Sequence, residues 1–241
     1  MKKIILIPTR LNSKRLPHKA LLEIDKKPLI MHTYFRSKLS KLADDVYVCT
    51  DSDKIISVCK KFKAKYIRTK SSHNNGTERI AEACKKIKLQ SDDIVIDVQG
   101  DEPLINPSHI DLVIKFFKKN KFEIVVPHIK ILNGSKSNVV KLLVNKNNQI
   151  KWMSRSSVPF NFYSKKINYL KHLSIIAFTK KSLIKYSSLK RSKYEKIESI
   201  ELLRGIENNM NLGSFSINSD SFSIDILEDF IKAKKYFLND K

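Results

Sequence analysis

The sequence of 241 residues has few cysteines and no pattern among them. Cys49, Cys59 and Cys84 are odd in number, widely spaced and without a CxxC pair. This usage indicates neither a disulfide framework nor a zinc site. It is typical of a reducing compartment, so we expect a cytoplasmic protein.

A long hydrophobic run is also missing. No stretch approaches the roughly 20 apolar residues that a membrane span requires. The apolar segment 4–7 follows Met1 and two lysines, but Pro8 and Arg10 end it too early for a secretory signal. With 41% hydrophobic and 9% aromatic residues, the composition is that of a globular protein. We therefore expect a soluble protein with no membrane partner, and a buried first strand.

Arginine is scarce among the basic residues, although the formal net charge is +23. Eight of the 47 Lys and Arg residues are arginine, and the lysines are scattered over predicted solvent faces. A strong basic excess can draw a protein onto nucleic acid. No arginine-rich stripe and no aromatic pattern for stacking bases accompanies it here. We interpret the lysines as solvated surface residues and expect no specific nucleic-acid partner.

The chain contains no internal repeat and no Pro/Gly/Ser-rich linker, so we expect one α/β domain over residues 1–241. Short apolar runs alternate with segments of helical period, which is typical of βαβ units and a mainly parallel sheet. The predicted strands are 3–8, 46–50, 65–68, 93–98, 123–128, 139–144, 173–178 and 212–217. The predicted helices are 29–42, 53–62, 77–88, 107–119, 193–208 and 227–237. Residues 130–190 depart from the alternation and are interpreted as an insertion carrying substrate contacts or a dimer face.

A cationic loop follows the first predicted strand. Residues 8–19 read PTRLNSKRLPHK and include Arg10, Lys14, Arg15 and Lys19. Ligands bind at the carboxyl edge of an open α/β sheet. Cations there can neutralise a triphosphate, each well-placed donor contributing about 2.7–4 kcal/mol in the transition state. The loop matches neither the P-loop nor the dinucleotide fingerprint, so alone it favours phosphate binding only slightly over a solvated basic loop.

Two carboxylates follow another predicted strand in the segment VQGDEP, residues 98–103. A carboxylate just past a buried strand can hold Mg²⁺, which prefers oxygen ligands and usually shares its shell with phosphates and water. Acidic residues at strand ends also begin turns or cap helices. Gly100 indicates close approach of a ligand beside Asp101, and this favours the metal.

The segment HNNGTER, residues 73–79, lies before and at the start of a predicted helix. A helix N-terminus offers free amides to an anion or a base edge. The alternative is a capping Thr77 followed by a surface pair, Glu78 and Arg79. From the residues alone, that alternative is favoured.

Seven blocks resemble, in order, those of the CMP-Kdo synthetases, or 3-deoxy-manno-octulosonate cytidylyltransferases. They read IPTRLNSKRLPHK, NGTER, VQGDEP, KWMSRSSVP, KHLSIIAF, EKIESIELLR and SIDILEDF. The blocks span almost the whole chain, and GTER with VQGDEP after such a first block is a specific combination. CMP-sialic acid synthetases typically read GSKG where residues 12–15 read NSKR. Spore-coat-type cytidylyltransferases share a similar RLP loop but are not associated with GTER and VQGDEP.

The resemblance implies a fold and an activity. The fold would be a three-layer α/β/α nucleotide-diphospho-sugar transferase domain, with an antiparallel excursion used to form a homodimer. The enzyme would transfer CMP from CTP to Kdo, an acidic eight-carbon sugar, releasing pyrophosphate, for lipopolysaccharide biosynthesis. Two magnesium ions would assist.

The resemblance also implies roles for individual residues. Asp101 and Asp225 would hold magnesium, with Lys19 beside them as a further catalytic residue. CTP contacts would come from Arg10, Ser13, Arg15, Lys19, Thr77, Glu78 and Gln99. Sugar contacts would come from Arg155, His172, Glu198 and Glu201. The two glutamates would lie on the helix closing the sugar site, or else be ordinary exposed helix acids.

Several positions depart from the family pattern. They are His18 and Ala20 in the first loop, Leu202 in place of the glutamine of EQLR, and Ser223 and Ile226 in the last block. Most of them fall near the expected sugar and metal positions. The acceptor could therefore be an 8-amino derivative of Kdo or another ulosonic acid. A nucleic-acid-binding or catalytically inactive homologue is the alternative of another class.

Overall fold

The computed structural model describes residues 1–13, 15–132, 134, 136–163 and 166–239. Lys14, one of the four cations expected around a triphosphate, therefore lies outside the described residues. Within those ranges, no helix combines the length and apolar character needed to cross a membrane.

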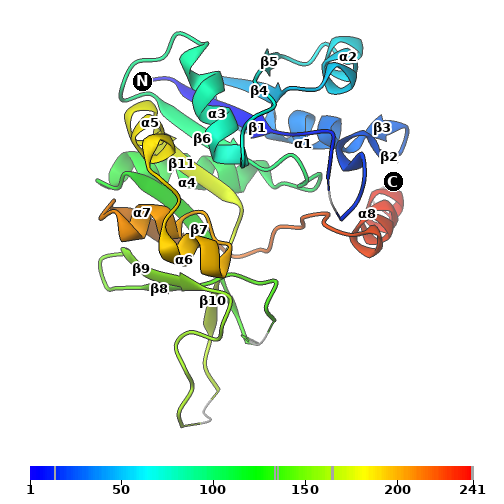
Figure 1. The fold of residues 1–241 in the computed structure, drawn as a ribbon. Helices are drawn as coiled ribbons and strands as arrows, with labels where there is room; N and C mark the ends of the chain where they lie inside the picture. The colour runs from blue at the N-terminus through cyan, green and yellow to red at the C-terminus, as the bar shows by residue number, and fades with distance from the viewer. Residues whose placement is uncertain (14, 133, 135, 164–165, 240–241) are drawn as a thin grey trace.

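A mixed central sheet runs through the molecule (Figure 1). Its parallel half contains, in spatial order, β5 (Tyr66–Arg68), β4 (Asp45–Thr50), β1 (Lys3–Pro8) and β6 (Ile94–Val98). Beyond β6, β11 (Ile175–Thr179) pairs antiparallel with both β6 and β7 (Ile124–Ile131), and β12 (Leu212–Ser216) pairs parallel with β7. Every residue of β1 after Lys3 is buried, because both faces of this half are covered.

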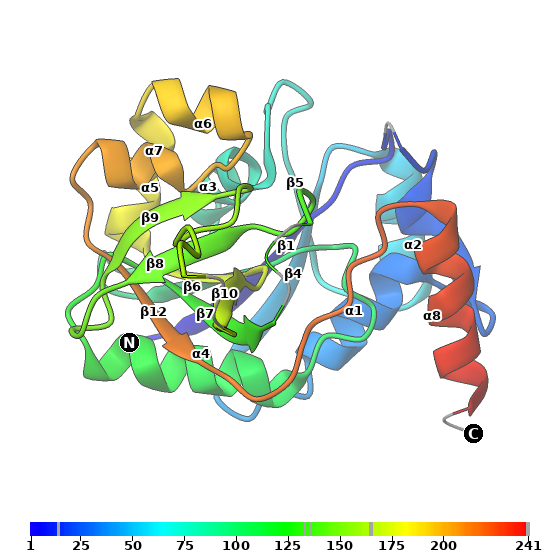
Figure 2. The ribbon, with the colours of Figure 1, turned by 90° about the horizontal axis from the view of Figure 1, so that it is seen from below.

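Helices cover both faces of the sheet (Figure 2). One hydrophobic core joins the sheet to α1 (Leu29–Ser37), α2 (Asp53–Lys61) and α4 (Pro107–Lys119). A second core joins it to α3 (Gly76–Lys85), α5 (Lys180–Ser188) and α7 (Leu203–Glu207). The predicted three-layer α/β/α arrangement is thus confirmed.

Capping residues fix where several helices begin. Asn106 accepts a hydrogen bond from the Ser108 N–H at 3.0 Å, and Pro107 occupies the first turn of α4. Asparagine is favoured as the residue that caps a helix, and proline at the first helical position. Thr179 and Ser182 form a reciprocal capping box at the start of α5. α4 has the predicted bounds, whereas α5 was not predicted at all.

The prediction of one helix over 193–208 is wrong. The chain forms α6 (Lys193–Glu198) and α7, separated by Ser199, whose φ of 51° lies in the left-handed region. A non-glycine residue there interrupts a right-handed helix. The spacing of apolar residues is helical on both sides of the break, so the sequence pattern does not reveal it.

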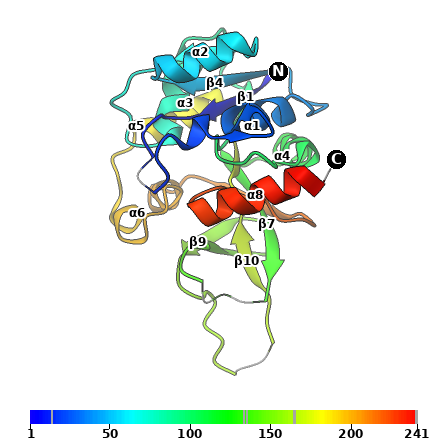
Figure 3. The same ribbon diagram turned by 90° about the vertical axis from the view of Figure 1, so that its right-hand side faces the viewer.

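Beyond β7 the sheet continues as an antiparallel excursion that projects from the body (Figures 1 and 3). It consists of β10 (Tyr169–His172), β8 (Lys141–Val144) and β9 (Ile150–Ser154), in that spatial order. β9 and β10 were not predicted. Three aromatic side chains between them, Phe160, Phe162 and Tyr163, are 77–80% exposed.

The C-terminal segment packs against the first loop. α8 (Leu227–Asn239) lies beside the small hairpin of β2 (Glu23–Ile24) and β3 (Lys27–Pro28) (Figure 1). Leu16, Ile24, Leu29, Ile224, Phe230 and Ala233 form a separate core there. This core fixes the residues just before α8 next to the loop that follows β1.

Candidate active site

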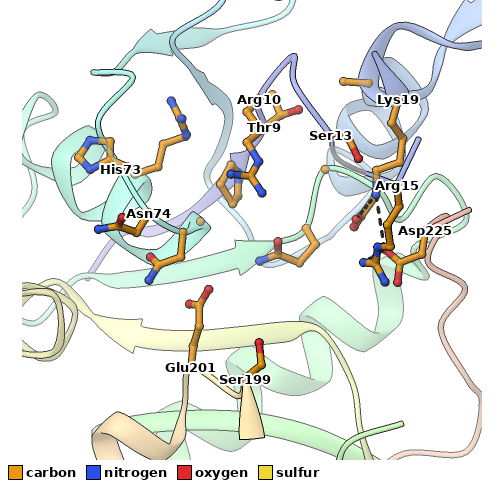
Figure 4. Close-up of a pocket in the computed structure, with 18 of the residues that line it drawn as sticks. Thr9, Arg10, Ser13, Arg15, Lys19, His73, Asn74, Ser199, Glu201 and Asp225 are labelled. Atoms are coloured by element: carbon orange, nitrogen blue, oxygen red, sulfur yellow. Dashed lines mark hydrogen bonds and ion pairs between the residues drawn. The ribbon is translucent and has the colours of Figure 1, made fainter. Parts of the chain in front are cut away.

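A polar cavity of about 640 Å³ lies at the carboxyl edge of β1 and β6 (Figure 4). Because these strands are parallel neighbours, the loops after them emerge at the same edge. The predicted site residues that line the cavity are Arg10, Ser13, Arg15, Lys19, Gln99, Asp101, Arg155, Glu201 and Asp225. Its volume is within the usual range for a small-molecule site, roughly 300–1,000 Å³.

One end of the cavity is formed by charged groups that converge on Lys19 (Figure 4). Lys19 Nζ lies 2.6 Å from Asp101 Oδ2 and 3.7 Å from Asp225 Oδ1, and it donates to the Ile224 carbonyl at 2.6 Å. Arg15 Nη2 donates to Asp225 Oδ1 at 2.6 Å. The Ile224 N–H also bonds the Asp101 carbonyl, at 2.9 Å. The predicted cations and carboxylates of this end therefore lie together.

The two carboxylates, Asp101 and Asp225, do not by themselves make a metal site. Among the described residues, no group of three or more His, Cys, Asp or Glu side chains could hold a metal. Mg²⁺, however, is usually bound by one or two carboxylates together with substrate phosphates and water. Asp101 and Asp225 supply such oxygens around a position that already favours a cation, Lys19 Nζ. The donor set fits Mg²⁺ shared with a bound triphosphate.

The end of β6 requires a glycine. A Cβ at Gly100 would lie 3.0 Å from the Pro8 carbonyl oxygen and 3.2 Å from Thr9 Cβ. Such contacts would push the β1 loop away from Asp101. Gly100 thus lets the loops after β1 and β6 touch, whereas the sequence had indicated the close approach of a ligand.

Gln99, beside Gly100, is held by a hydrogen bond to the buried carboxyl group of Asp97. Its Nε2 donates to Asp97 Oδ1 at 2.9 Å. Asp97 is fully buried in β6, and burial, followed by the nearby carboxylates, raises its pKa well above the usual range. Gln99 therefore reaches the cavity with its side-chain position already constrained.

The far end of the cavity is the loop before α3 (Figure 4). His73, Asn74, Asn75 and Gly76 line it, whereas Thr77 and Glu78 do not. Asn75 caps α3 by accepting from the Glu78 N–H at 2.8 Å, and Glu78 Oε2 accepts from the Asn74 N–H at 3.0 Å. Glu78 thus shapes the loop from behind the cavity wall.

His73 is held by Glu82 of α3. Its Nε2 lies 2.5 Å from Glu82 Oε2, and Lys86 Nζ lies 2.7 Å from Glu82 Oε1. Burial alone would raise the pKa of Glu82, but hydrogen bonds from Lys86, the Lys70 N–H and His73 lower it to about 2. Glu82 is consequently ionised at neutral pH and fixes the His73 ring.

Arg155 enters the cavity from the end of β9, and carbonyl oxygens hold its guanidinium. Its Nε donates to the Glu198 carbonyl at 2.7 Å, and its two Nη atoms donate to the carbonyls of Ser199 and Ser137 at 3.1 and 3.2 Å. A guanidinium has five N–H donors, so two remain without a partner in the described part of the chain. These two are suited to an anionic ligand.

Glu198 does not line the cavity, contrary to its predicted place at the sugar. Its carboxylate accepts from Ser154 Oγ at 2.7 Å and from the Arg155 N–H at 2.8 Å. It is the last residue of α6, and the break at Ser199 turns its side chain toward β9. Its carboxylate supports Arg155 from behind.

Glu201 does line the cavity, from the turn between α6 and α7 (Figure 4). Thr77 Oγ1 donates to its Oε2 at 2.9 Å, so Thr77 supports Glu201 rather than contacting the cavity itself. Burial raises the pKa of Glu201. It is therefore not an ordinary exposed helix acid.

A buried ion pair keeps this turn in place. Arg204 of α7 donates to Glu195 of α6 from Nη2 at 2.6 Å and from Nε at 2.8 Å, with side chains 1% and 2% exposed. Arg204 Nη1 also lies 3.9 Å from Glu78 Oε1 of α3. The bidentate pair ties α6 and α7 together on either side of Ser199 and Glu201.

His172 is not among the residues that line the cavity, although it was predicted to face the sugar. It lies on β10 directly opposite His128 of β7, so the strand pairing directs it into the excursion. Its Nε2 is buried with no partner in the described ranges, and burial lowers its pKa to about 4. The imidazole is neutral at pH 7.

The positions that depart from the family pattern have distinct surroundings. His18 adopts φ 55°, ψ 23°, the left-handed conformation that glycine adopts readily, and Ala20 lines the cavity. Leu202 is buried in the second core, which joins the sheet to α3, α5 and α7. Ser223 Oγ donates to Glu102 Oε1 at 2.9 Å, and Ile226 is exposed. Glu102 is fully buried, and burial, with the Asp101 charge, raises its pKa to about 7.

Some lining residues were not assigned from the sequence. His73, Asn74 and Asn75 lie just before a predicted helix, and a polar loop at a helix N-terminus was the available signal. The prediction assigned contacts to the first helical residues instead. No sequence pattern pointed to Ser199 as a cavity residue, because its position depends on the unpredicted break between α6 and α7.

Comparison with known proteins gives concordant results. Residues 4–212 match the model of a family described as Cytidylyltransferase. A 3-deoxy-manno-octulosonate cytidylyltransferase of Chloroherpeton thalassium is 37% identical over 243 residues, covering 97% of each chain. An 8-amino-3,8-dideoxy-manno-octulosonate cytidylyltransferase of a Shewanella strain is 35% identical over 240 residues, covering 98% of each.

A solved structure is also similar over its whole length. It is a CMP:2-keto-3-deoxy-manno-octonic acid synthetase complexed with CTP, with a TM-score of 0.95, 30% sequence identity and full coverage of both chains. The architecture described above, including the antiparallel excursion, is therefore shared with a protein that binds CTP.

Proposed function

The chain belongs to the cytidylyltransferase family, and on that premise we propose that it transfers CMP from CTP to Kdo. The products would be CMP-Kdo and pyrophosphate, for lipopolysaccharide biosynthesis. The observation that carries the proposal is the convergence of Lys19 and Arg15 on Asp101 and Asp225 at one end of a polar cavity. Three free, buried cysteines support a cytoplasmic setting.

The proposed reaction is a single displacement at phosphorus. The anomeric hydroxyl oxygen of the sugar bonds to the α-phosphorus of CTP, and the bond from that phosphorus to the β-phosphate bridging oxygen breaks. The hydroxyl proton is released, and pyrophosphate carries away the electron pair. Positioning and charge stabilisation supply most of the catalysis in such transfers.

Lys19, Arg15 and Arg10 would bind the phosphates, with Ser13 in the same loop. Lys19 is well placed for this, because its ammonium already lies beside both carboxylates. Asp101 and Asp225 would hold Mg²⁺, which when bound polarises phosphoryl oxygens as a Lewis acid. Gln99 and the loop before α3, supported by Thr77 and Glu78, would bind the nucleoside part.

Arg155 would bind the carboxylate of the sugar. Its guanidinium is already fixed by three carbonyls, and its two remaining N–H groups can donate to the two oxygens of a carboxylate. Glu201 would accept hydrogen bonds from sugar hydroxyls. A relative that acts on the 8-amino sugar is nearly as similar as the Kdo relative, so the 8-amino derivative is the second candidate acceptor.

Pyrophosphate release tests the proposal. Purified protein with Mg²⁺ and CTP should release pyrophosphate when Kdo is added, and not with sialic acid or without sugar. Faster release with 8-amino-Kdo would change only the acceptor. Failure with every acid by a folded protein that binds CTP would contradict the proposed reaction.

A salt series separates the remaining alternative. Nucleic-acid binding through scattered lysines should weaken steeply as salt rises, because counterions are released. CTP bound in the cavity should depend mainly on Mg²⁺. Tight, salt-resistant CTP binding would therefore support the enzyme, and salt-sensitive RNA or DNA binding without CTP binding would support the alternative.

We also propose that the excursion forms a homodimer through its exposed aromatic residues. Phe160 and Phe162 are 80% and 77% exposed, which is unusual for such side chains on a surface without a partner. The double substitution Phe160→Ser and Phe162→Ser should convert a dimer into a monomer in light scattering. The matched change of Leu39, 64% exposed beyond the end of α1, to Ser should leave the mass unchanged.

A further inference from the structure

We infer that Lys141, a buried lysine of the excursion, is a positioning residue that holds Arg155 ready for the acid group of the sugar. The inference rests on the proposed function, because it concerns how the acceptor is bound. Lys141 lies outside the cavity lining and was not singled out by any sequence motif.

The Lys141 ammonium is fully buried and surrounded by carbonyl oxygens. Its side chain is 0% exposed. Nζ donates to the carbonyls of Lys136 at 3.1 Å and Val139 at 2.9 Å, and to that of Arg155. An ammonium has three donors, and here all three have partners. A buried charge is costly unless it is bonded in this way, so such a lysine is a specific feature of the site.

Opposite charges hold the two backbone groups of Arg155. Its carbonyl accepts from Lys141, and its N–H donates to Glu198 Oε2 at 2.8 Å. The register of β8 and β9 places Lys141 directly opposite Ser154, whose hydroxyl donates to the other Glu198 oxygen at 2.7 Å. Lys141 and Glu198 therefore clamp the Arg155 peptide groups between them.

The contacts of Lys141 and Glu198 with the Arg155 backbone take the place of β-sheet hydrogen bonds, which end at Ser154. β9 ends at Ser154, so Arg155 is the first residue beyond the strand and lacks ladder hydrogen bonds. An arginine on a free strand end would lose side-chain and backbone entropy on binding its ligand. With both backbone groups fixed, the guanidinium is preorganised for the sugar.

The local charge also suits an anion. Lys141 and Arg155 are cations and Glu198 is an anion, so the cluster keeps one positive charge. A sugar carboxylate would neutralise it. The anion would contact Arg155, and Lys141 acts on it only by holding the Arg155 backbone.

The test is steady-state kinetics of Lys141→Met in the full-length protein, with Kdo and CTP varied separately. We expect the KM for Kdo to rise about tenfold or more, as when a binding group is displaced, while the KM for CTP changes less than about twofold. The control is Lys151→Met, one strand away and exposed, which should match the wild type.

A double-mutant cycle separates positioning from general damage. In an Arg155→Ala background, Lys141→Met should raise the KM for Kdo no further, because the positioned group is gone. Equal rises in both KM values, or additive effects in the cycle, would overturn the inference.

Glu198→Gln gives an independent measurement if Lys141→Met does not fold. It keeps the size of the clamp but removes its anion, and the KM for Kdo should again rise selectively. An unchanged value would count against the clamp. A wild-type protein inactive with both Kdo and 8-amino-Kdo would overturn the proposed function and this inference together, whereas an active one with unmoved KM values would overturn only the inference.

Discussion

Replacement of Asp101 by asparagine is expected to lower kcat about 100- to 1,000-fold, the cost of removing a group that organises charge in the transition state. The substitution keeps the size of the side chain and removes its charge. Asp101 Oδ2 lies 2.6 Å from Lys19 Nζ and faces the cavity. Under the proposed assignment, the pair that it forms with Asp225 would then no longer hold Mg²⁺ against the phosphates of CTP.

The matched control is Asp92→Asn. Asp92 is exposed just before β6, whereas Asp101 follows the same strand at its other end. Turnover should be measured at saturating Mg²⁺, with circular dichroism to confirm folding. If Asp101→Asn turned over within about tenfold of the wild type, less than one such group should cost, the metal assignment would be wrong.

Replacement of Lys19 by methionine is expected to have the second-largest effect, again about 100- to 1,000-fold in kcat, with a raised KM for CTP. Lys19 supplies a positive charge where the CTP phosphates are proposed to bind. Its ammonium contacts both carboxylates and the Ile224 carbonyl. Methionine keeps most of the apolar stem and removes the donors. Lys54→Met, on the exposed face of α2, is the control.

The two variants should differ in how they bind Mg²⁺ in the absence of CTP. Asp101→Asn removes a proposed Mg²⁺ ligand, so calorimetric titration should show weaker binding. Lys19→Met removes a cation that competes for the same two carboxylates, so binding should be unchanged or tighter. Weakened Mg²⁺ binding in both variants would contradict the separate roles assigned to Lys19 and Asp101.

Local patterns were sufficient for much of the fold and for one side of the site. β1 and α4 have their predicted bounds, because a buried apolar run and a capped, Pro-initiated helix are determined by neighbouring residues. Local patterns also singled out Asp101 and three loop cations that line the cavity, Arg10, Arg15 and Lys19. Parallel strands bring the ends of β1 and β6 to one edge, so no distant contact had to be known.

Contacts between distant residues account for what was missed. Asp225 was assigned only through the family resemblance, and it reaches the site by bonding Arg15, 210 residues away in the chain. Ser199 breaks a helical pattern that continues on both sides, and the resulting turn moves Glu198 out of the cavity and Glu201 into it. His172 is directed elsewhere by its pairing with His128, which composition does not reveal.

The small core shared by Leu16, Ile24 and α8 has a consequence for the order in which a ribosome makes this enzyme. The sheet and the other residues that line the cavity, Asp101 among them, all emerge before Asp225. A nascent chain can therefore fold the sheet and most of the cavity while it contains Asp101 but not yet Asp225. We expect activity to begin only when residues 224–239 have emerged and docked on the first loop, so that this late-translated segment turns the enzyme on.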